Sequence, residues 1–151
     1  MRELLEAILR GDREGPPVAK LLGMRLVEVG DGEAAFELEA DPELHANPMG
    51  TLHGGILCDL ADAAMGCAYA SRLGEGESFT TVELKANFLR PVRSGLLTAR
   101  ARVVKGGRTI GLVECDVLDE HGELVARAGS TCMTLRSDRE ADGSPASPSA
   151  K

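Results

Sequence analysis

The feature that most constrains this chain is an almost uninterrupted apolar stretch at residues 55–72, which reads GILCDLADAAMGCAYASR. It is rich in alanine and leucine, whereas a helix on the surface of a globular protein would carry a polar face as well as an apolar one. The stretch therefore predicts a long helix that is buried on nearly every side. Such a helix needs an apolar surface wrapped around it.

The segments on both sides of this helix alternate apolar and polar residues with a period of two, which is the pattern of half-buried β-strands. The predicted strands are residues 24–29, 34–40, 82–88, 97–103, 113–117 and 124–135. The later segments are joined by turns that are too short for parallel crossovers. We therefore expect an α+β fold in which a curved antiparallel sheet of five to six strands wraps the long central helix.

The chain has 151 residues, which is enough for one domain and leaves little room for a second. Residues 1–22 predict an N-terminal helical arm, with an amphipathic helix at residues 3–9 and one further turn at residues 18–22. Residues 23–136 form the predicted domain. Residues 137–151 are rich in serine, proline and charge, a composition that predicts disorder.

Charge and composition restrict the classes of partner and the cellular compartment that we expect. The net charge of −7 argues against nucleic acid. No apolar run reaches the length of a membrane span, and the first ten residues lack the apolar core of a signal peptide. We therefore expect a cytoplasmic protein with no membrane partner. The four cysteines form no CxxC pair and the three histidines are scattered, which predicts core cysteines and no metal site.

A predicted loop at residues 41–52 leads through Gly54 and Gly55 into the apolar helix. Free backbone N–H groups at a helix start lie at the positive end of the helix dipole and can hold the oxyanion of an acyl transfer. Farther along, Asp62 places a carboxylate in an apolar segment, which is costly unless the group is paired or used. The structural alternatives are that Gly54 and Gly55 are a plain loop-to-helix junction and that Asp62 is the polar edge of the helix. For Asp59, one turn earlier, a solvated acid is the better interpretation.

Three motifs, in this order, resemble those of the PaaI-type hotdog thioesterases, the phenylacetate-degradation and 4-hydroxybenzoyl-CoA thioesterase group. The first runs from Asn47 to Asp62 and contains HGG at residues 53–55. The second, TVELKANFLRP at residues 81–91, resembles the family's T-V-x-L-x-x-x-F-L-R-P strand, and the third, GGRT at residues 106–109, resembles a family turn. The resemblance implies a hotdog fold and the hydrolysis of an acyl-CoA to a free acid and CoA, without a metal or another cofactor.

The resemblance also implies roles for single residues. Asp62 matches the acid on the central helix, which acts as nucleophile or general base. Gly54 matches the glycine whose N–H polarises the thioester carbonyl, and His53 and Asn47 match residues that orient the thioester or the attacking water. Thr81 matches a hydroxyl that positions water in some members of the family.

The threonine match is in conflict with strand alternation. If the period of two is unbroken, Thr80 and not Thr81 shares a face with Val82 and Leu84, so either hydroxyl could face the site. The resemblance further suggests a binding region for CoA and its phosphates, with ordinary solvated charge as the alternative. Its residues are Gly55, Arg90, Lys105, Gly106 and Arg108.

The spacing of Gly54 and Asp62 bears on assembly. They are eight residues apart, so along one helix they lie ~12 Å apart, and one thioester carbonyl cannot touch both. The donor and the carboxylate must therefore come from two helices. The family places them across a two-fold dimer interface, which yields two equal sites. We accordingly expect a homo-oligomer, a dimer assembled further into a dimer of dimers, that is a homotetramer.

Two other functions are weighed against acyl-CoA hydrolysis. A non-catalytic acyl-CoA-binding or regulatory module would have no reason to bury Asp62. A hotdog hydratase or dehydratase needs a different acid and base pairing, which His53 before the two glycines does not suggest. The acyl group is expected to be aryl or medium-chain, in a pocket lined by aliphatic and aromatic side chains. The residues expected to line it are Leu57, Leu60, Met65 and Phe79.

Overall fold

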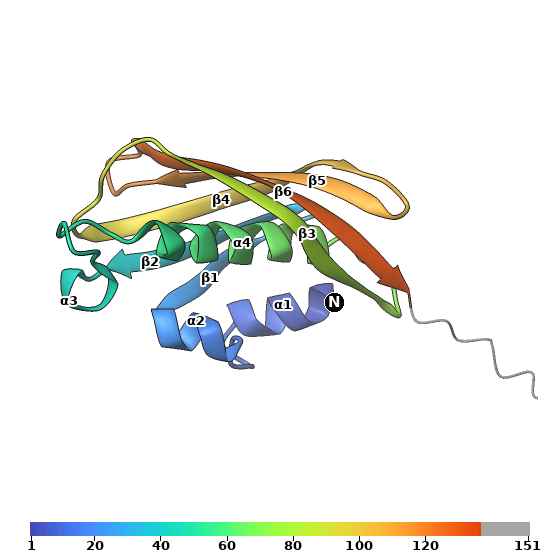
Figure 1. Ribbon diagram of the computed structural model, residues 1–151. Coiled ribbons are helices and arrows are strands. Elements are labelled where there is room, and N and C mark those ends of the chain that lie inside the picture. The colour runs from blue at the N-terminus through green and yellow to red at the C-terminus, as the bar shows by residue number, and fades with distance from the viewer. Residues whose placement is uncertain (137–151) are drawn as a thin grey trace, which may run out of the picture.

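A six-stranded antiparallel sheet wraps around one long helix, as Figure 1 shows. This computed structural model describes residues 1–136, and the predicted disordered tail at residues 137–151 lies outside the described part. The helices are α1 (Arg2–Leu9), α2 (Pro17–Leu22), α3 (Pro42–His45) and α4 (Gly54–Ala70). The strands are β1 (Met24–Val29), β2 (Glu33–Ala40), β3 (Glu77–Phe88), β4 (Gly95–Gly106), β5 (Ile110–Leu118) and β6 (Leu124–Arg136). The predicted α+β fold with a central helix is therefore confirmed, with six strands.

The strands follow the order β1-β2-β4-β5-β6-β3, and every neighbouring pair is antiparallel. The long strand β3 therefore forms one edge of the sheet and has a neighbour on one side only. Helix α4 lies against the sheet, and α1 and α2 lie next to β1, away from β5 and β6 (Figure 1). Among residues 1–136, no helix is long and apolar enough to cross a membrane.

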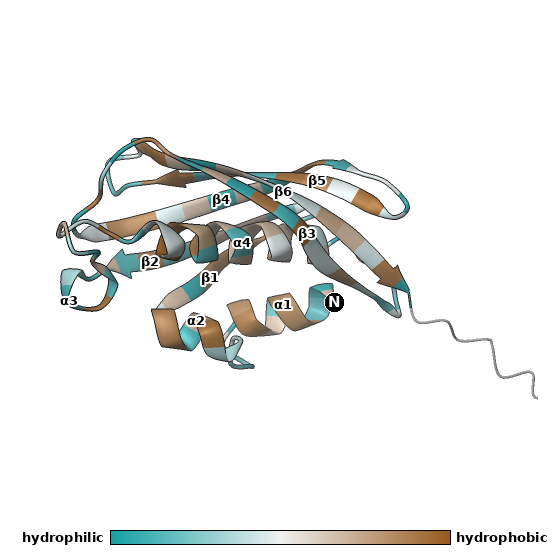
Figure 2. Ribbon diagram, in the orientation of Figure 1, coloured by the Kyte–Doolittle hydropathy of each residue, from teal (hydrophilic) through white to brown (hydrophobic). Residues whose placement is uncertain are grey.

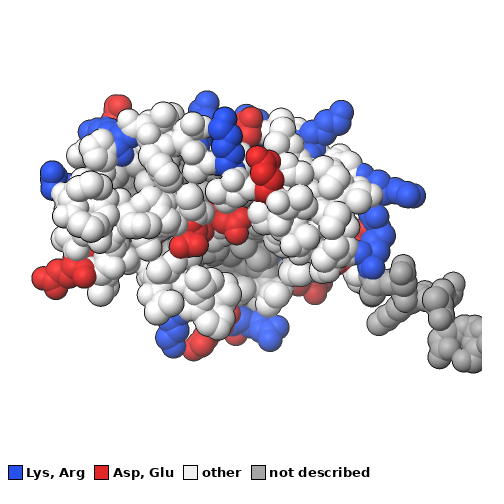
Figure 3. Space-filling view, viewed as in Figure 1, with Lys and Arg blue, Asp and Glu red and all other residues white. Residues whose placement is uncertain are grey.

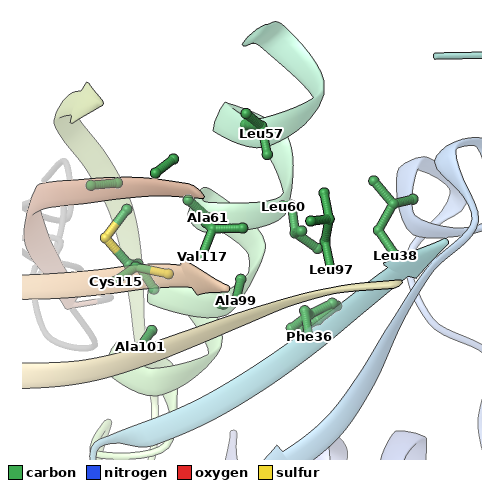
Figure 4. Packing of buried hydrophobic residues seen from close by; sticks show 14 of the residues in the cluster. Phe36, Leu38, Leu57, Leu60, Ala61, Leu97, Ala99, Ala101, Cys115 and Val117 are labelled. Carbon is green, nitrogen blue, oxygen red and sulfur yellow. The ribbon is translucent and has the colours of Figure 1, made fainter. Parts of the chain in front are cut away.

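The alternation of the strands sorts their side chains between the core and the solvent, as the colours of Figure 2 illustrate. In β4, Leu97 and Ala99 are buried, whereas Arg100 and Arg102 point outward. The two arginines pair with Glu28 of β1 and Glu114 of β5, at 3.1 and 2.9 Å. These pairs are exposed, so they contribute little to stability. The aliphatic side chains on the inner face, drawn in Figure 4, hold the sheet to α4.

Helix α4 has two different faces. The face toward the sheet is buried and carries Leu57, Leu60 and Met65. The opposite face is only partly covered and includes Asp62 and Cys67. Within Gly54–Ala70 only Asp59 is exposed, so the prediction of a helix buried on nearly every side holds fully for the side toward the sheet and in part for the opposite side. The helix ends at Ala70, two residues before the end of the apolar stretch that predicts it.

The loop predicted at residues 41–52 contains the short helix α3. Asp41 starts it, because its side chain accepts a hydrogen bond from the N–H of Glu43 at 2.8 Å, which is the usual role of an N-cap residue. The imidazole of His45, at the other end of α3, is buried and accepts a hydrogen bond from the N–H of Asp41 at 3.1 Å. These two bonds give the segment before the predicted site a defined shape, which its mixed composition does not reveal.

Tyr69, near the end of α4, ties the helix to two strands. Its hydroxyl group is 2.8 Å from the hydroxyl of Thr134 in β6, and its ring covers Gly111 in β5. A Cβ atom added at Gly111 would overlap that ring. Gly111 therefore has to be a glycine for reasons of packing.

We predict that Gly111→Ala lowers the free energy of unfolding by about 1–3 kcal/mol, the usual effect of forcing an extra methyl group into a packed core. Gly129→Ala on the neighbouring strand β6 is the matched control, because the nearest atom to its added Cβ would be the Val113 carbonyl oxygen at 3.9 Å. Urea unfolding followed by circular dichroism measures both. Equal stability of the two variants would show that the ring of Tyr69 does not restrict this position.

Candidate active site

The first turn of α4 presents one free backbone donor. His53 is the N-cap residue, and its Nδ1 accepts a hydrogen bond from the N–H of Gly55 at 2.9 Å. The N–H of Ile56 donates to the carbonyl oxygen of His53 at 3.0 Å. Within residues 1–136 no acceptor is found for the N–H of Gly54. This N–H therefore remains available to an anionic oxygen at the positive end of the helix dipole.

A Cβ atom added at either glycine would come close to a neighbouring side chain. A Cβ at Gly54 would lie 3.0 Å from Cζ of Phe88, whose ring covers the helix start from β3. A Cβ at Gly55 would lie 2.9 Å from Nδ1 of His53. Because His53 already accepts the N–H of Gly55, a contact between that N–H and a substrate would require His53 to move.

Asn47 organises the loop that precedes the helix. Its Oδ1 accepts hydrogen bonds from the N–H groups of Met49 and Thr51, at 2.9 and 3.2 Å, and its Nδ2 donates to Oγ1 of Thr51 at 2.9 Å. The side chain lines the same cavity of about 320 Å³ as Gly54. Since an amide nitrogen carries two hydrogens, one N–H of Asn47 is left for a ligand in that cavity.

The carboxylate of Asp62 is held by Thr81. Oγ1 of Thr81 in β3 donates a hydrogen bond to Oδ1 of Asp62 at 3.1 Å. The pairing of β3 with β6 shifts between Thr81 and Glu83, which leaves Val82 57% exposed at a β-bulge. Thr80 is exposed. The alternation that favoured Thr80 is wrong here, because the bulge interrupts the period of two and turns Thr81 inward.

Asp62 lines a different cavity from Gly54. This cavity measures about 700 Å³ and lies between α4 and the N-terminal helices. Asp59, Ala63 and Cys67 of α4 also line it, and Figure 3 shows acidic atoms gathered beside a hollow on this side of the molecule. Asp59 is exposed, in agreement with the interpretation of a solvated acid.

The two cysteines near Asp62 are neutral thiols. Burial, with a smaller effect of the charge of Asp62, raises the pKa of Cys67 to about 12. Burial and the nearby charges of Asp59 and Asp62 also raise the pKa of Cys58. A thiolate is therefore scarce at neutral pH at either position. Within residues 1–136, no group of three or more His, Cys, Asp or Glu side chains could hold a metal ion.

The four residues expected to line the acyl pocket do not line the cavity that contains Asp62. Leu57, Leu60 and Met65 are buried on the face of α4 that packs against the sheet. Phe79 packs over Gly66, with its ring 5.7 Å from that of Tyr69. Leu57 also lines the cavity of Gly54, and Gly66 follows Asp62 by one turn of the helix, so the expected lining of the acyl pocket stays a prediction. The predictions from the sequence do not include the N-terminal arm as one side of the cavity of Asp62. The amphipathic pattern of residues 3–9 is the available signal, because the apolar face of such a helix needs a surface to cover.

The basic residues predicted to bind CoA do not come together in one chain. Arg90 lines the cavity of Gly54 and pairs with Asp119 at 3.2 Å. Lys105 and Gly106 are the last residues of the 12-residue strand β4, and Arg108 follows in the turn to β5. A strand of that length spans roughly 36 Å.

Comparisons with known proteins agree with this fold. The family described as the Thioesterase superfamily matches residues 49–126. The 1,4-dihydroxy-2-naphthoyl-CoA hydrolase of Listeria monocytogenes is 32% identical over 104 residues, 69% of this chain and 84% of that protein.

Two solved structures are similar to this chain over most of their length. A thioesterase from Haemophilus influenzae has a TM-score of 0.79 and 28% identity, and the match covers 90% of this chain and 94% of the other. A variant of the phenylacetic acid degradation protein PaaI from Thermus thermophilus has a TM-score of 0.72 and 29% identity, with coverage of 78% and 98%. This chain belongs to the thioesterase superfamily. The predicted resemblance to the PaaI-type hotdog thioesterases is thereby confirmed.

We predict that Thr81→Val lowers kcat for thioester hydrolysis roughly five- to tenfold, because it removes the hydrogen bond that orients the carboxylate of Asp62. Thr80→Val is the matched control, since that exposed neighbour does not contact Asp62, and we expect almost no change. Release of free thiol from acyl-CoA measures both rates, and circular dichroism confirms that both variants fold. A larger loss in Thr80→Val than in Thr81→Val would contradict the assignment.

Proposed function

We propose that this protein hydrolyses the thioester of an acyl-CoA to the free acid and CoA, at a site that two copies of the chain build together. One observation carries the proposal. The free N–H of Gly54 and the carboxylate of Asp62 lie on the same helix, ~12 Å apart by their spacing, and they line separate cavities. A second helix, from another copy, brings the two groups to one carbonyl. The CoA hydrolase among the relatives supports the choice of substrate.

The fold offers a surface for the second copy. Strand β3 is at the sheet edge with one side unpaired, and such an edge is a template for another strand. The partly covered face of α4 adjoins it, and Val82 and Phe88 on β3 are more than half exposed. A two-fold axis through this surface sets the start of α4 in one copy beside the middle of α4 in the other. Gly54 of one copy then faces Asp62 of its partner.

In this site the carbonyl oxygen of the thioester accepts the hydrogen bond from Gly54, which stabilises the oxyanion formed on attack. Asp62 takes a proton from water as the hydroxyl oxygen attacks the carbonyl carbon, and collapse of the oxyanion expels the CoA thiolate, which is then protonated. In the alternative route Asp62 attacks directly and water cleaves the resulting anhydride. Either route needs the ionised carboxylate that Thr81 orients.

His53 and Asn47 can donate hydrogen bonds near Gly54 in this site. The Nδ1 of His53 accepts a hydrogen bond, so the proton of its neutral imidazole is on Nε2, which can donate to the thioester or to the attacking water. Asn47 has one amide N–H left and lies beside Gly54. Both side chains therefore act as hydrogen-bond donors that orient the substrate.

We predict that Asp62→Asn lowers kcat at least ~100-fold, the lower end of what a positioned base or nucleophile supplies. Asp59→Asn, one turn away on the same helix, is the matched control and is expected to stay near wild type. Release of free thiol from a panel of acyl-CoAs gives the rates. Full activity of Asp62→Asn would overturn the mechanism, and an absence of thiol release from every acyl-CoA would favour a non-hydrolytic binding protein.

Mixed dimers test the shared site. Gly54→Pro removes the N–H donor at a helix position where proline is tolerated, and Gly54→Ala is the control that meets the ring of Phe88 in the same way but keeps the N–H. Each of Asp62→Asn and Gly54→Pro should be inactive alone. Their mixed dimer keeps one intact site, so activity should return to roughly half of the wild-type value per mixed dimer. Mixed dimers that form and remain inactive would contradict a site shared by two copies.

The same two-fold arrangement gives the CoA phosphates a binding region. It brings the turn between β4 and β5 of the partner toward the start of α4, where Arg90 is located. Arg90 of one copy and Lys105 and Arg108 of the other then offer positive charge on a protein whose net charge is −7. Phosphate groups pair well with such side chains.

We predict that Arg108→Ala raises KM for an acyl-CoA roughly three- to tenfold and leaves KM for the matching acyl-pantetheine unchanged, because only the former carries the nucleotide phosphates. Arg102→Ala is the matched control on the outer face of the sheet. Steady-state kinetics with both substrates measure the effect. Equal changes for the two substrates would exclude a phosphate contact at Arg108.

A further inference from the structure

Helices α1 and α2 enclose, together with α4 and β1, the cavity of about 700 Å³ that contains Asp62. Leu4, Leu5 and Ile8 line it from α1. Leu5 is 5% exposed, so it anchors α1, whereas Leu4 is 37% exposed at the margin. The arm therefore lies over the carboxylate side of α4, with the cavity between them.

The cavity is too large to be a packing defect. Ile8 of α1, Val18 of α2, Leu26 of β1 and Ala63 of α4 all border it. Apolar side chains usually close such gaps, because facing atoms lose dispersion contacts across an empty space. Its volume lies within the range of small-molecule sites, roughly 300–1,000 Å³. The size and the apolar walls are those of a site for an apolar group.

The charged side chains that line the cavity are on α4 and at its solvent-exposed margin. Asp59 and Asp62 are on α4, and the other charged lining residues, Arg13, Glu14 and Arg25, are exposed to solvent. The remaining lining side chains are apolar, apart from the thiol of Cys67. An acyl group that starts at Asp62 therefore meets hydrocarbon, and hydroxyl groups on it would find no buried hydrogen-bond partner among these residues.

We infer that the N-terminal arm is the wall of the acyl pocket and sets the length of the apolar, medium-chain acyl group that the enzyme accepts, with Ile8 as a specificity-determining residue. The inference rests on the proposed function, since the thioester carbon bound at Asp62 is what directs the acyl chain into this cavity. Ala63, beside Asp62, leaves the entrance open because its side chain is a single methyl group. Ile8, on the facing helix, limits the space beyond it.

Binding of non-hydrolysable thioethers tests the arm separately from catalysis. S-decyl-CoA carries a long hydrocarbon chain and S-ethyl-CoA a short one, and neither has a carbonyl group to attack. In Ile8→Trp the indole fills the cavity, and we expect the affinity for S-decyl-CoA to fall roughly tenfold or more, since several methylene groups lose their burial. The affinity for S-ethyl-CoA should not change. Leu9→Trp is the matched control, because Leu9 does not line the cavity.

Calorimetric titration measures both ligands in all three proteins, and thermal melting confirms that they fold. If Ile8→Trp does not fold, Ile8→Ala takes its place, and the loss of apolar contact should weaken S-decyl-CoA alone by roughly fivefold. Equal effects on the two ligands, or equal effects of the substitutions at Ile8 and Leu9, would overturn the inference. Because no turnover is involved, a failure of Asp62 as the catalytic group would appear in thiol release and not in these titrations.

Discussion

The contact between α4 and the sheet is the constraint on which the rest of this structure depends. Leu60, Ala64 and Met65 are completely buried on one side of the helix, and burial of such side chains contributes roughly 1.5–3 kcal/mol for each large one. This packing fixes the rotation of α4 about its own axis. It also places Asp62 on the other side of the helix, where its carboxylate meets Thr81 of the edge strand β3 and the cavity below the arm.

Much of this arrangement could be predicted from the sequence. The apolar stretch at residues 55–72 and the period of two around it were enough for the central helix, the six strands and their antiparallel pairing. The sequence does not reveal which face of the apolar helix packs against the sheet. A helix face in the core and a face left for a partner have similar compositions. Leu60 and Met65, for example, are predicted to line the acyl pocket but are completely buried on the face of α4 that packs against the sheet.

The β-bulge at Val82 shows a second limit. Alternation assumes an unbroken register, and a single extra residue in one strand reverses the face of everything before it. The sequence around Thr81 contains no glycine or proline that would announce such a break. The family resemblance points to Thr81, which contacts Asp62, whereas the alternation points to Thr80. A family motif is read position by position, so an interrupted register does not mislead it. The hydrogen bond from Thr81 to Asp62 depends on that irregularity.

Small residues on α4 connect stability with the proposed function. Gly54 admits the ring of Phe88, Gly66 admits the ring of Phe79, and Ala63 leaves space beside Asp62. Each of these positions gives up apolar burial that a larger side chain would provide within one chain. A helix face of this kind, next to an unpaired edge strand, leaves a single copy with surface that it cannot cover. In the proposed dimer the partner that covers this surface also brings the oxyanion donor, so that assembly and catalysis would depend on the same contact.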